Sequence, residues 1–371
     1  MANEDKAARY HRLQRRASLA GTAASTIFFL ALFFSGGSAA VRDAIAALAG
    51  GSFALLVIGY VVVVAVIHEL LQLPFAFYQG VTLERRYQLS RQTTASWWKD
   101  HAKAWALGMG LALGASLLIW SLLRWTPQWW WLLAGVTFAA LLVVLAQIAP
   151  VVLLPLFYDC TPLDRPALTA RLIALAERAR TPVLGVFEWR LSDRTRKANA
   201  ALAGIGGTRR ILLSDTLLAE HSDDEIEVIL AHELAHHVHR DIWSGIALES
   251  ALIVGGFFLA DRVLSAFATS YGMTGKSDIA ALPLLVLCTG AVSLLLMPVA
   301  NAFSRAHERR ADRYALTMTR NADAFVTAMR RLAAQNLAEE RPPRLVEVLF
   351  HSHPSTTARI AAAQEWRRSA S

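Results

Sequence analysis

The sequence predicts a mainly α-helical fold, a multi-pass transmembrane bundle of about six spans with a smaller α+β domain. Composition is the first observation behind this prediction. The 371 residues are 55% hydrophobic, their mean hydropathy is +0.37, and only 18% are charged, whereas soluble domains have roughly 25% charged residues. The second observation is a set of six apolar segments long enough to cross a bilayer, which requires about 20 residues each.

The six apolar segments are long and continuous enough to be helices. They are Ser18–Ala40, Ser52–Phe75, Ala102–Leu123, Trp129–Phe157, Ile242–Phe267 and Ile279–Phe303. One such segment could be a buried helix of a soluble core, but six in one chain favour a membrane. Tryptophans such as Trp97, Trp98 and Trp125 lie at the predicted ends, where their rings favour the headgroup region. The basic start and Ser38-Ala39-Ala40 leave a cleavable signal peptide as an alternative for the first segment, although that segment is long for one.

The spans divide the chain into two regions. Residues 1–157 form an N-terminal membrane region with four spans, and residues 158–371 form a second region interrupted by spans at 242–267 and 279–303. Lys and Arg are concentrated in the N-terminal tail and the second loop, so the positive-inside rule places residues 158–241 and the C-terminal tail in the cytoplasm. These loops also explain the net charge of +8. Membrane lipid is therefore an expected partner, and nucleic acid is not.

The polar part of the second region has the pattern of a small α+β domain. Pro166–Arg180 has the periodicity of an amphipathic helix, and Val183–Leu191 and Arg209–Leu213 have the composition of short strands. After the last span we expect the helix to continue over Ser304–Thr319, followed by further helices at Ala322–Asn336 and Thr356–Arg368. Polar segments on both sides of the last two spans must therefore meet at one end of that helix pair.

The most informative motif is His232-Glu233-Leu234-Ala235-His236, in a predicted helix with an acidic first turn. Residues four apart lie one turn apart, so His232 and His236 project from one face and can share a tetrahedral Zn²⁺. Glu233 then lies near the open coordination position, where a carboxylate can take a proton from a metal-activated water. A chance occurrence of this short pattern on a polar helix face is the alternative.

A catalytic zinc normally has three protein ligands, and the segment Ser304–Asp312 offers the third. Glu308 and Asp312 are one helical turn apart, so one can bind the metal while the other orients a ligand histidine. By spacing alone, an ordinary solvated helix face is the more common explanation of such a pair. His307 is a competing ligand, but it points about 100° away from Glu308 on a helix.

Longer segments resemble the integral-membrane zinc metallopeptidases typified by the type I CAAX prenyl protease, over nearly the whole chain. The similar segments are Leu73–Phe75, Leu83–Tyr87, Gln92-Thr93, Pro155–Phe157, Thr161–Leu163, Lys197–Ala200, Arg210–Leu213, Asp215–Leu218, Ser304–Asp312, Ser352–Pro354 and Arg359-Ile360. Their number and order make a chance match remote. The resemblance implies that the polar region is a cytoplasmic, zincin-like α+β metallopeptidase domain.

Carried over residue by residue, the resemblance implies that His232, His236 and Glu308 bind one Zn²⁺ per chain. It further implies that Glu233 is the general base and that Asp312 orients a ligand histidine.

Three more roles follow from the same resemblance. Asn199 is similar to the residue that holds the substrate backbone beside an edge strand, and His353 and Arg359 to the groups that stabilise the oxyanion and brace the site. A histidine and a guanidinium suit this role because negative charge develops on the tetrahedral oxygen. The chain departs from the eukaryotic proteases in lacking their first span and their acidic insertion before HExxH, which leaves the shape of the membrane chamber open.

The resulting functional prediction is a zinc-dependent endopeptidase of a bacterial inner membrane, with its active site on the cytoplasmic side. The Ala/Leu/Arg-rich composition suggests a bacterium, where prenylated substrates are not expected, so membrane-associated or unfolded peptides are the predicted substrates. Strict processing of lipidated CAAX peptides is the alternative within the peptidases. A transporter would explain the six spans and polar residues such as His68, Glu69 and Asp261, but not HExxH together with Glu308.

Overall fold

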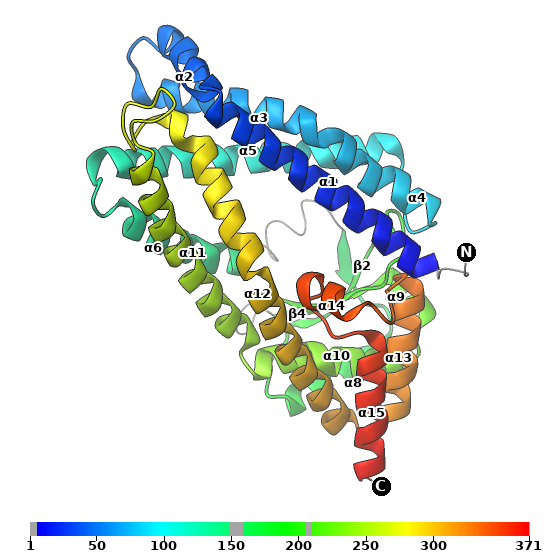
Figure 1. The fold of residues 1–371 in the computed structure, drawn as a ribbon. Coiled ribbons are helices and arrows are strands. Elements are labelled where there is room, and N and C mark those ends of the chain that lie inside the picture. The colour runs from blue at the N-terminus through cyan, green and yellow to red at the C-terminus, as the bar shows by residue number, and fades with distance from the viewer. Residues whose placement is uncertain (1–5, 149–158, 205–208, 371) are drawn as a thin grey trace.

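The structure, a computed structural model, describes residues 6–148, 159–204 and 209–370. Six of its helices are long and apolar enough to cross a membrane, as predicted. They are α1 (Lys6–Phe34), α3 (Phe53–Phe77), α5 (Thr94–Trp125), α6 (Trp130–Ile148), α11 (Asp241–Ala266) and α12 (Leu282–Thr319). Each packs against the next, and α12 packs against α1, so the six helices close into a ring (Figure 1).

Helices α1 and α5 begin before the predicted spans, at Lys6 and Thr94, and α1 also ends earlier than predicted. The first helix ends at Phe34, because Gly36 adopts a left-handed conformation with φ 74°, and a short helix α2 (Gly37–Leu48) follows. As predicted, the last span continues as a helix to Thr319, so one helix joins the membrane region to the polar domain. The part of the fourth predicted span after Ile148 lies outside the described residues, as does the Pro155–Phe157 segment.

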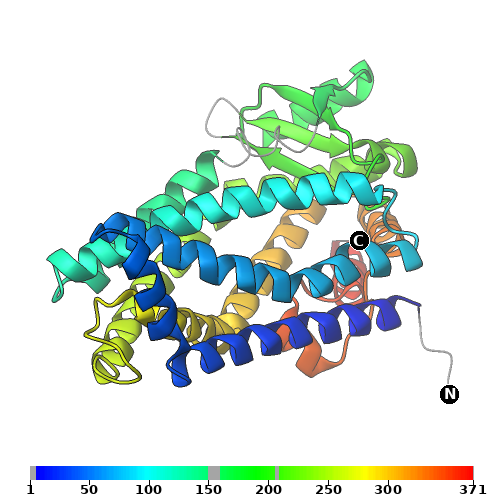
Figure 2. The same ribbon diagram turned by 90° about the horizontal axis from the view of Figure 1, so that it is seen from above.

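The polar domain contains a four-stranded sheet of order β1-β2-β4-β3, which lies on the α5 side of the ring (Figure 2). Its strands are β1 (Cys160–Pro162), β2 (Gly185–Trp189), β3 (Ala200–Ala203) and β4 (Arg210–Ser214). β2 and β4 are parallel, and the two outer pairings are antiparallel. Only β2 and β4 were predicted, because the three residues of β1 and the alanine-rich β3 have little strand propensity of their own.

Helices surround this sheet and complete the domain. They are α8 (Pro166–Arg178), α9 (Asp215–Glu220), α10 (Asp223–Val238), α13 (Ala322–Gln335), α14 (Arg344–Phe350) and α15 (Thr356–Ala370). Three short helical segments, η1 (Tyr78–Leu83), α4 (Glu84–Arg86) and η4 (Ile279–Ala281), connect the spans. Ile226 and Leu234 of α10 are fully buried with Phe325 of α13, so α10 is the central helix of the polar core.

The start of α10 is fixed by a capping box. The Ser222 hydroxyl accepts a hydrogen bond from the backbone N–H of Glu225, and the Glu225 carboxylate accepts one from the N–H of Ser222. These bonds satisfy two backbone donors that have no partner within the helix. The helix that contains the HExxH motif therefore begins at a defined residue.

Replacing Ser222 by Ala should lower the thermal unfolding midpoint of the purified protein. The substitution removes the acceptor at the helix start, and such caps contribute about 0.5–2 kcal/mol. Ser222→Asp retains an acceptor and is the matched control. A scanning fluorimetry experiment in detergent in which both variants lose the same stability would contradict the role of the cap.

Candidate metal centre

Two packed helices bring three potential metal ligands together. His232 and His236 project from α10, and Glu308 projects from α12, which packs against α10. His232 Nε2 lies 3.2 Å from Glu308 Oε2, and His236 Nε2 lies 3.5 Å from Glu308 Oε1. Within the described ranges, this is the one group of three His, Cys, Asp or Glu side chains whose ligand atoms lie within 4.8 Å of one another.

Carboxylates on the far side of both imidazole rings fix their orientation. His232 Nδ1 lies 2.9 Å from Asp312 Oδ1, and His236 Nδ1 lies 2.9 Å from Asp241 Oδ2. A ring nitrogen beside a carboxylate carries a proton and donates it in a hydrogen bond, which directs Nε2 of each ring toward the metal position. Burial alone would lower the pKa of His232, but the Asp312 and Glu308 carboxylates outweigh it and raise the pKa to about 9. A metal ion must therefore compete with a proton for this ring.

The buried carboxylate of Glu308 indicates whether these residues fit a metal ion. Its Oε2 is buried and lies 3.2 Å from His232 Nε2 and 2.9 Å from His353 Nδ1, but no donor among the described residues forms a hydrogen bond of good geometry with it. A buried carboxylate oxygen without a donor is costly. Two imidazole nitrogens and one carboxylate are a typical donor set for catalytic zinc, so the residues present fit the metal.

Glu233 lies beside the ligands without a competing partner. It is half-buried on α10 and makes no hydrogen bond or ion pair with any residue that the structure describes. Burial raises the pKa of its carboxyl group, although His232 and His236 act in the opposite direction. A carboxylate with a raised pKa and no fixed partner is suited to accept and return a proton.

Two residues from the C-terminal segment reach the same centre. Arg359 of α15 donates two hydrogen bonds to the Asp312 carboxylate, from Nε at 2.8 Å and from Nη2 at 2.5 Å. Its Nη2 also lies 3.4 Å from His232 Nδ1. His353 contacts Glu308, but 63% of its side chain is exposed. The guanidinium is thus engaged behind His232, whereas the His353 ring is largely open to solvent.

Asn199 immediately precedes the edge strand β3. Its backbone exchanges hydrogen bonds with Ser214, and the residue is exposed and lines a cavity of about 510 Å³. β3 contacts α10, so the free edge of the sheet lies beside the helix that contains the HExxH motif.

Asp241, the carboxylate behind His236, was not predicted from the sequence. Its side chain is 5% exposed and also forms an ion pair with Arg310 of α12. Arg240 has φ 56°, in the left-handed region, and this turn between α10 and α11 brings Asp241 back beside the His236 ring. The signal that the sequence offered was an acidic residue three positions after the end of the motif helix.

His307, the competing third ligand, lies outside this group. Its Nδ1 is 4.0 Å from Asp241 Oδ1, its Nε2 is 3.4 Å from the Ser244 hydroxyl, and its ring packs on Phe303. The side chain therefore contacts α11 and its own helix rather than the Glu308 carboxylate.

Six spans and a His-His-Glu centre on two helices define the class of integral-membrane zinc metalloproteases. Residues 162–367 match the family model of peptidase family M48, and residues 2–159 match that of the CAAX prenyl protease N-terminal region with five membrane helices. The chain belongs to peptidase family M48. It is a multi-pass membrane metalloprotease similar to the CAAX prenyl proteases, which removes the transporter alternative.

Individual relatives agree with this assignment. The chain is 33% identical over 341 residues to the "Uncharacterized metalloprotease YhfN" of Bacillus subtilis, covering 91% of this chain and 80% of that protein. It is 28% identical over 303 residues to a "CAAX prenyl protease 1 homolog" of Oryza sativa subsp. japonica, covering 80% and 70%. The crystal structure of S. mikatae Ste24p has the same fold, with a TM-score of 0.87 at 22% identity over 96% of this chain and 88% of that chain.

Replacing Glu308 by Ala should release zinc from the purified protein, whereas His307→Ala should retain it. Only the Glu308 carboxylate lies between the two Nε2 atoms, and loss of one of three ligands lowers affinity strongly. Metal analysis by mass spectrometry measures both variants. If Glu308→Ala retained zinc and His307→Ala lost it, the third ligand would be His307 rather than Glu308.

Asp241→Asn and Asp312→Asn should each weaken zinc binding by about 10–100-fold, as loss of a carboxylate behind a ligand histidine usually does. An amide in this place no longer selects the tautomer with the proton on Nδ1. Competition with a chelator gives the affinities, and Asp323→Asn, on an exposed face of α13, is the control. Equal affinities for all three variants would show that the carboxylates do not support the ligands.

Proposed function

We propose that this metalloprotease is a zinc-dependent endopeptidase of a bacterial inner membrane that cleaves membrane-associated or unfolded polypeptides. The observation that supports the chemistry is the joint arrangement of His232, His236 and Glu308. Both imidazoles are held with Nε2 toward Glu308, and the unpartnered carboxylate of Glu233 lies beside them. We assign the metal to these three ligands, with one Zn²⁺ per chain.

In the proposed reaction, the metal and the protein side chains have separate roles. When bound, zinc supplies Lewis acidity that lowers the pKa of a water molecule and polarises the scissile carbonyl. Glu233 accepts a proton from the attacking water and later gives it to the leaving amine. Asp312 and Asp241 hold the ligand rings, and Arg359 in turn holds Asp312.

Two of the predicted residues would then contact the substrate. His353 has an exposed ring next to the centre, from which it can donate a hydrogen bond to the developing oxyanion. Asn199 immediately precedes β3, and an extended peptide can add to the free edge of this strand through main-chain hydrogen bonds. The substrate backbone would then run beside α10, next to Glu233.

The site lies close to the predicted membrane boundary. Glu308 is five residues beyond the predicted end of the span at Phe303, on one continuous helix, which corresponds to about 7.5 Å along its axis. The Lys and Arg distribution puts this end in the cytoplasm. Polypeptides at the membrane surface are therefore the substrates best placed to reach the centre. The similarity to CAAX prenyl proteases keeps processing of lipidated C-termini as the second candidate.

Glu233→Gln should retain zinc and the fold but lose peptide hydrolysis. The amide is nearly isosteric but cannot accept the proton of the water, and general-base catalysis contributes roughly 10²–10⁴-fold. A fluorogenic peptide assay and metal analysis on the same preparation measure both properties. Cleavage at the wild-type rate would show that Glu233 is not the base.

A cysteine at Glu220, in a protein whose Cys160 and Cys288 are replaced by Ser, should resist an impermeant thiol reagent in intact cells and react in inverted vesicles. The charge bias of the loops is the physical reason for this orientation. Thr269→Cys, in the exposed loop between α11 and α12, is the control and should react from outside. The opposite labelling pattern would reverse the proposed topology.

A further inference from the structure

Arg310 of α12 contacts the carboxylate that lies behind one of the ligand rings. The Oδ2 atom of Asp241 lies 2.9 Å from His236 Nδ1, and Oδ1 accepts a hydrogen bond from the Arg310 guanidinium. Asp241 is buried, so its negative charge is shielded from water and requires a positive partner within the protein. His307 Nδ1 is 4.0 Å from Oδ1, too far for a hydrogen bond. Among the described residues, the permanent positive charge that contacts Asp241 is therefore that of Arg310.

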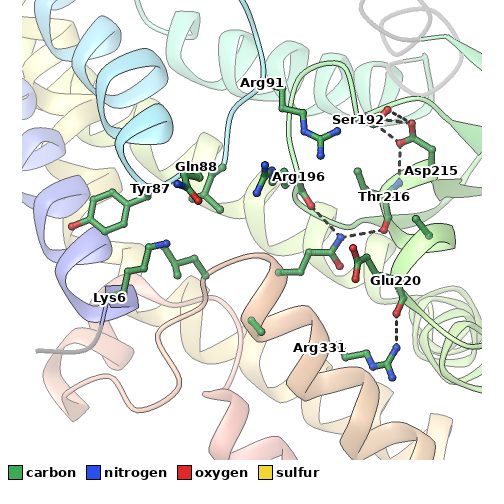
Figure 3. A pocket seen from close by; sticks show the side chains of 15 residues that line it. Lys6, Tyr87, Gln88, Arg91, Ser192, Arg196, Asp215, Thr216, Glu220 and Arg331 are labelled. Atoms are coloured by element: carbon green, nitrogen blue, oxygen red, sulfur yellow. Dashed lines mark hydrogen bonds between the residues drawn. The ribbon is translucent and has the colours of Figure 1, made fainter.

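The backbone does not hold the Asp241 carboxylate. Asp215 shows the alternative, because its carboxylate accepts hydrogen bonds from the backbone N–H groups of Ser192 and Thr216 (Figure 3). Among the residues that the structure describes, no backbone N–H donates to the Asp241 carboxylate. The position of this carboxylate therefore depends on side chains, and Arg310 binds the oxygen that does not face the imidazole.

The same stretch of α12 also contains the carboxylate behind the other ligand ring. That carboxylate is Asp312, to which Arg359 of α15 donates two hydrogen bonds. Arg310 and Asp312 differ by about 200° around the helix axis, so they face different neighbours. Asp312 contacts His232 of α10, whereas Arg310 contacts the first residue of α11. Each ligand ring thus has a carboxylate behind it, and each carboxylate has a guanidinium.

We propose that Arg310 is a positioning residue of the metal centre, which holds Asp241 where it orients the His236 ring. This inference rests on the proposed assignment of His236 as a zinc ligand. The side chain of His236 is 21% exposed, compared with 10% for His232, so packing restrains this ring less and the carboxylate behind it matters more. Without the guanidinium, the carboxylate loses one of its two bonds, and the ring loses a fixed partner for Nδ1.

Two adjacent arginines of α12 provide a matched comparison. Arg309 is exposed and forms no hydrogen bond or ion pair with any residue that the structure describes. The Arg310 side chain is 46% exposed, so replacing it opens no cavity in the core and should leave the fold intact. A difference between variants at these two positions therefore reports on the bond to Asp241 rather than on the loss of a positive charge near the centre.

The test is the zinc affinity of the intact protein in detergent, measured by competition with a chelator. We expect Arg310→Gln to weaken zinc binding on the order of 10-fold, at the lower end of the range for groups that support a ligand histidine. Arg310→Lys retains the charge and should recover part of this loss. Arg309→Gln should bind zinc as the wild type does. The thermal midpoint of each variant without metal controls for folding.

Cobalt in place of zinc gives a second measurement, because the visible absorption bands of Co²⁺ depend on the geometry of its ligands. We expect these bands to change in Arg310→Gln and to stay unchanged in Arg309→Gln. A loss of overall stability would not alter the spectrum of the protein that remains folded, so this measurement separates positioning from a general structural role.

A double-mutant cycle tests whether Arg310 acts through the carboxylate. In an Asp241→Asn background, Arg310→Gln should cause no further loss of zinc affinity, since the charged partner is already removed. The same loss in both backgrounds, wild-type affinity in Arg310→Gln, or an equal loss in Arg309→Gln would each overturn the proposal. If His236→Ala bound zinc as tightly as the wild type, the metal site itself would be wrong, and this inference with it.

Discussion

The packing of α10 against α12 is the contact on which the metal centre depends. α10 supplies both imidazoles, and α12 supplies Glu308 between them and Asp312 behind one of them. Neither helix contains a complete site, and residues more than 70 positions apart must meet within a few ångströms. The buried side chains Ile226, Leu234 and Phe325 hold α10 in its place in the core. The packing of these apolar side chains thus determines how the metal ligands are placed, although none of the three is itself a ligand.

Helical periodicity explains which parts of this arrangement were predictable. The i, i+4 spacing of His232 and His236 places both rings on one face in any helix, and the same spacing relates Glu308 to Asp312. The apolar segments likewise indicated six spans, because a bilayer requires a fixed length of helix. The family resemblance, rather than any spacing, suggested that Arg359 and His353 belong to the same centre.

The remaining features depend on tertiary contacts that leave little local trace. Strand β3 consists of Ala-Ala-Leu-Ala and is a strand only because β4 pairs with it. Asp241 reaches His236 because Arg240 adopts a left-handed backbone conformation, which no pattern around that residue indicates. The pairing of residues 89–91 with 194–196 joins two segments that are distant in sequence and lack strand composition.

Because α12 continues into the polar domain and a tight turn leads from α10 into α11, the metal centre is attached directly to two membrane helices. Glu308 lies on the same helix as the sixth span, with Pro298 between it and the start of that helix, and Asp241 is the first residue of α11. Spans tilt when the hydrocarbon thickness of a bilayer does not match their apolar length. A tilt of α11 or α12 would therefore move a carboxylate of the centre relative to the imidazoles of α10. The carboxylates Glu308 and Asp241 thus belong to the membrane helices, whereas the imidazoles beside them belong to the polar domain.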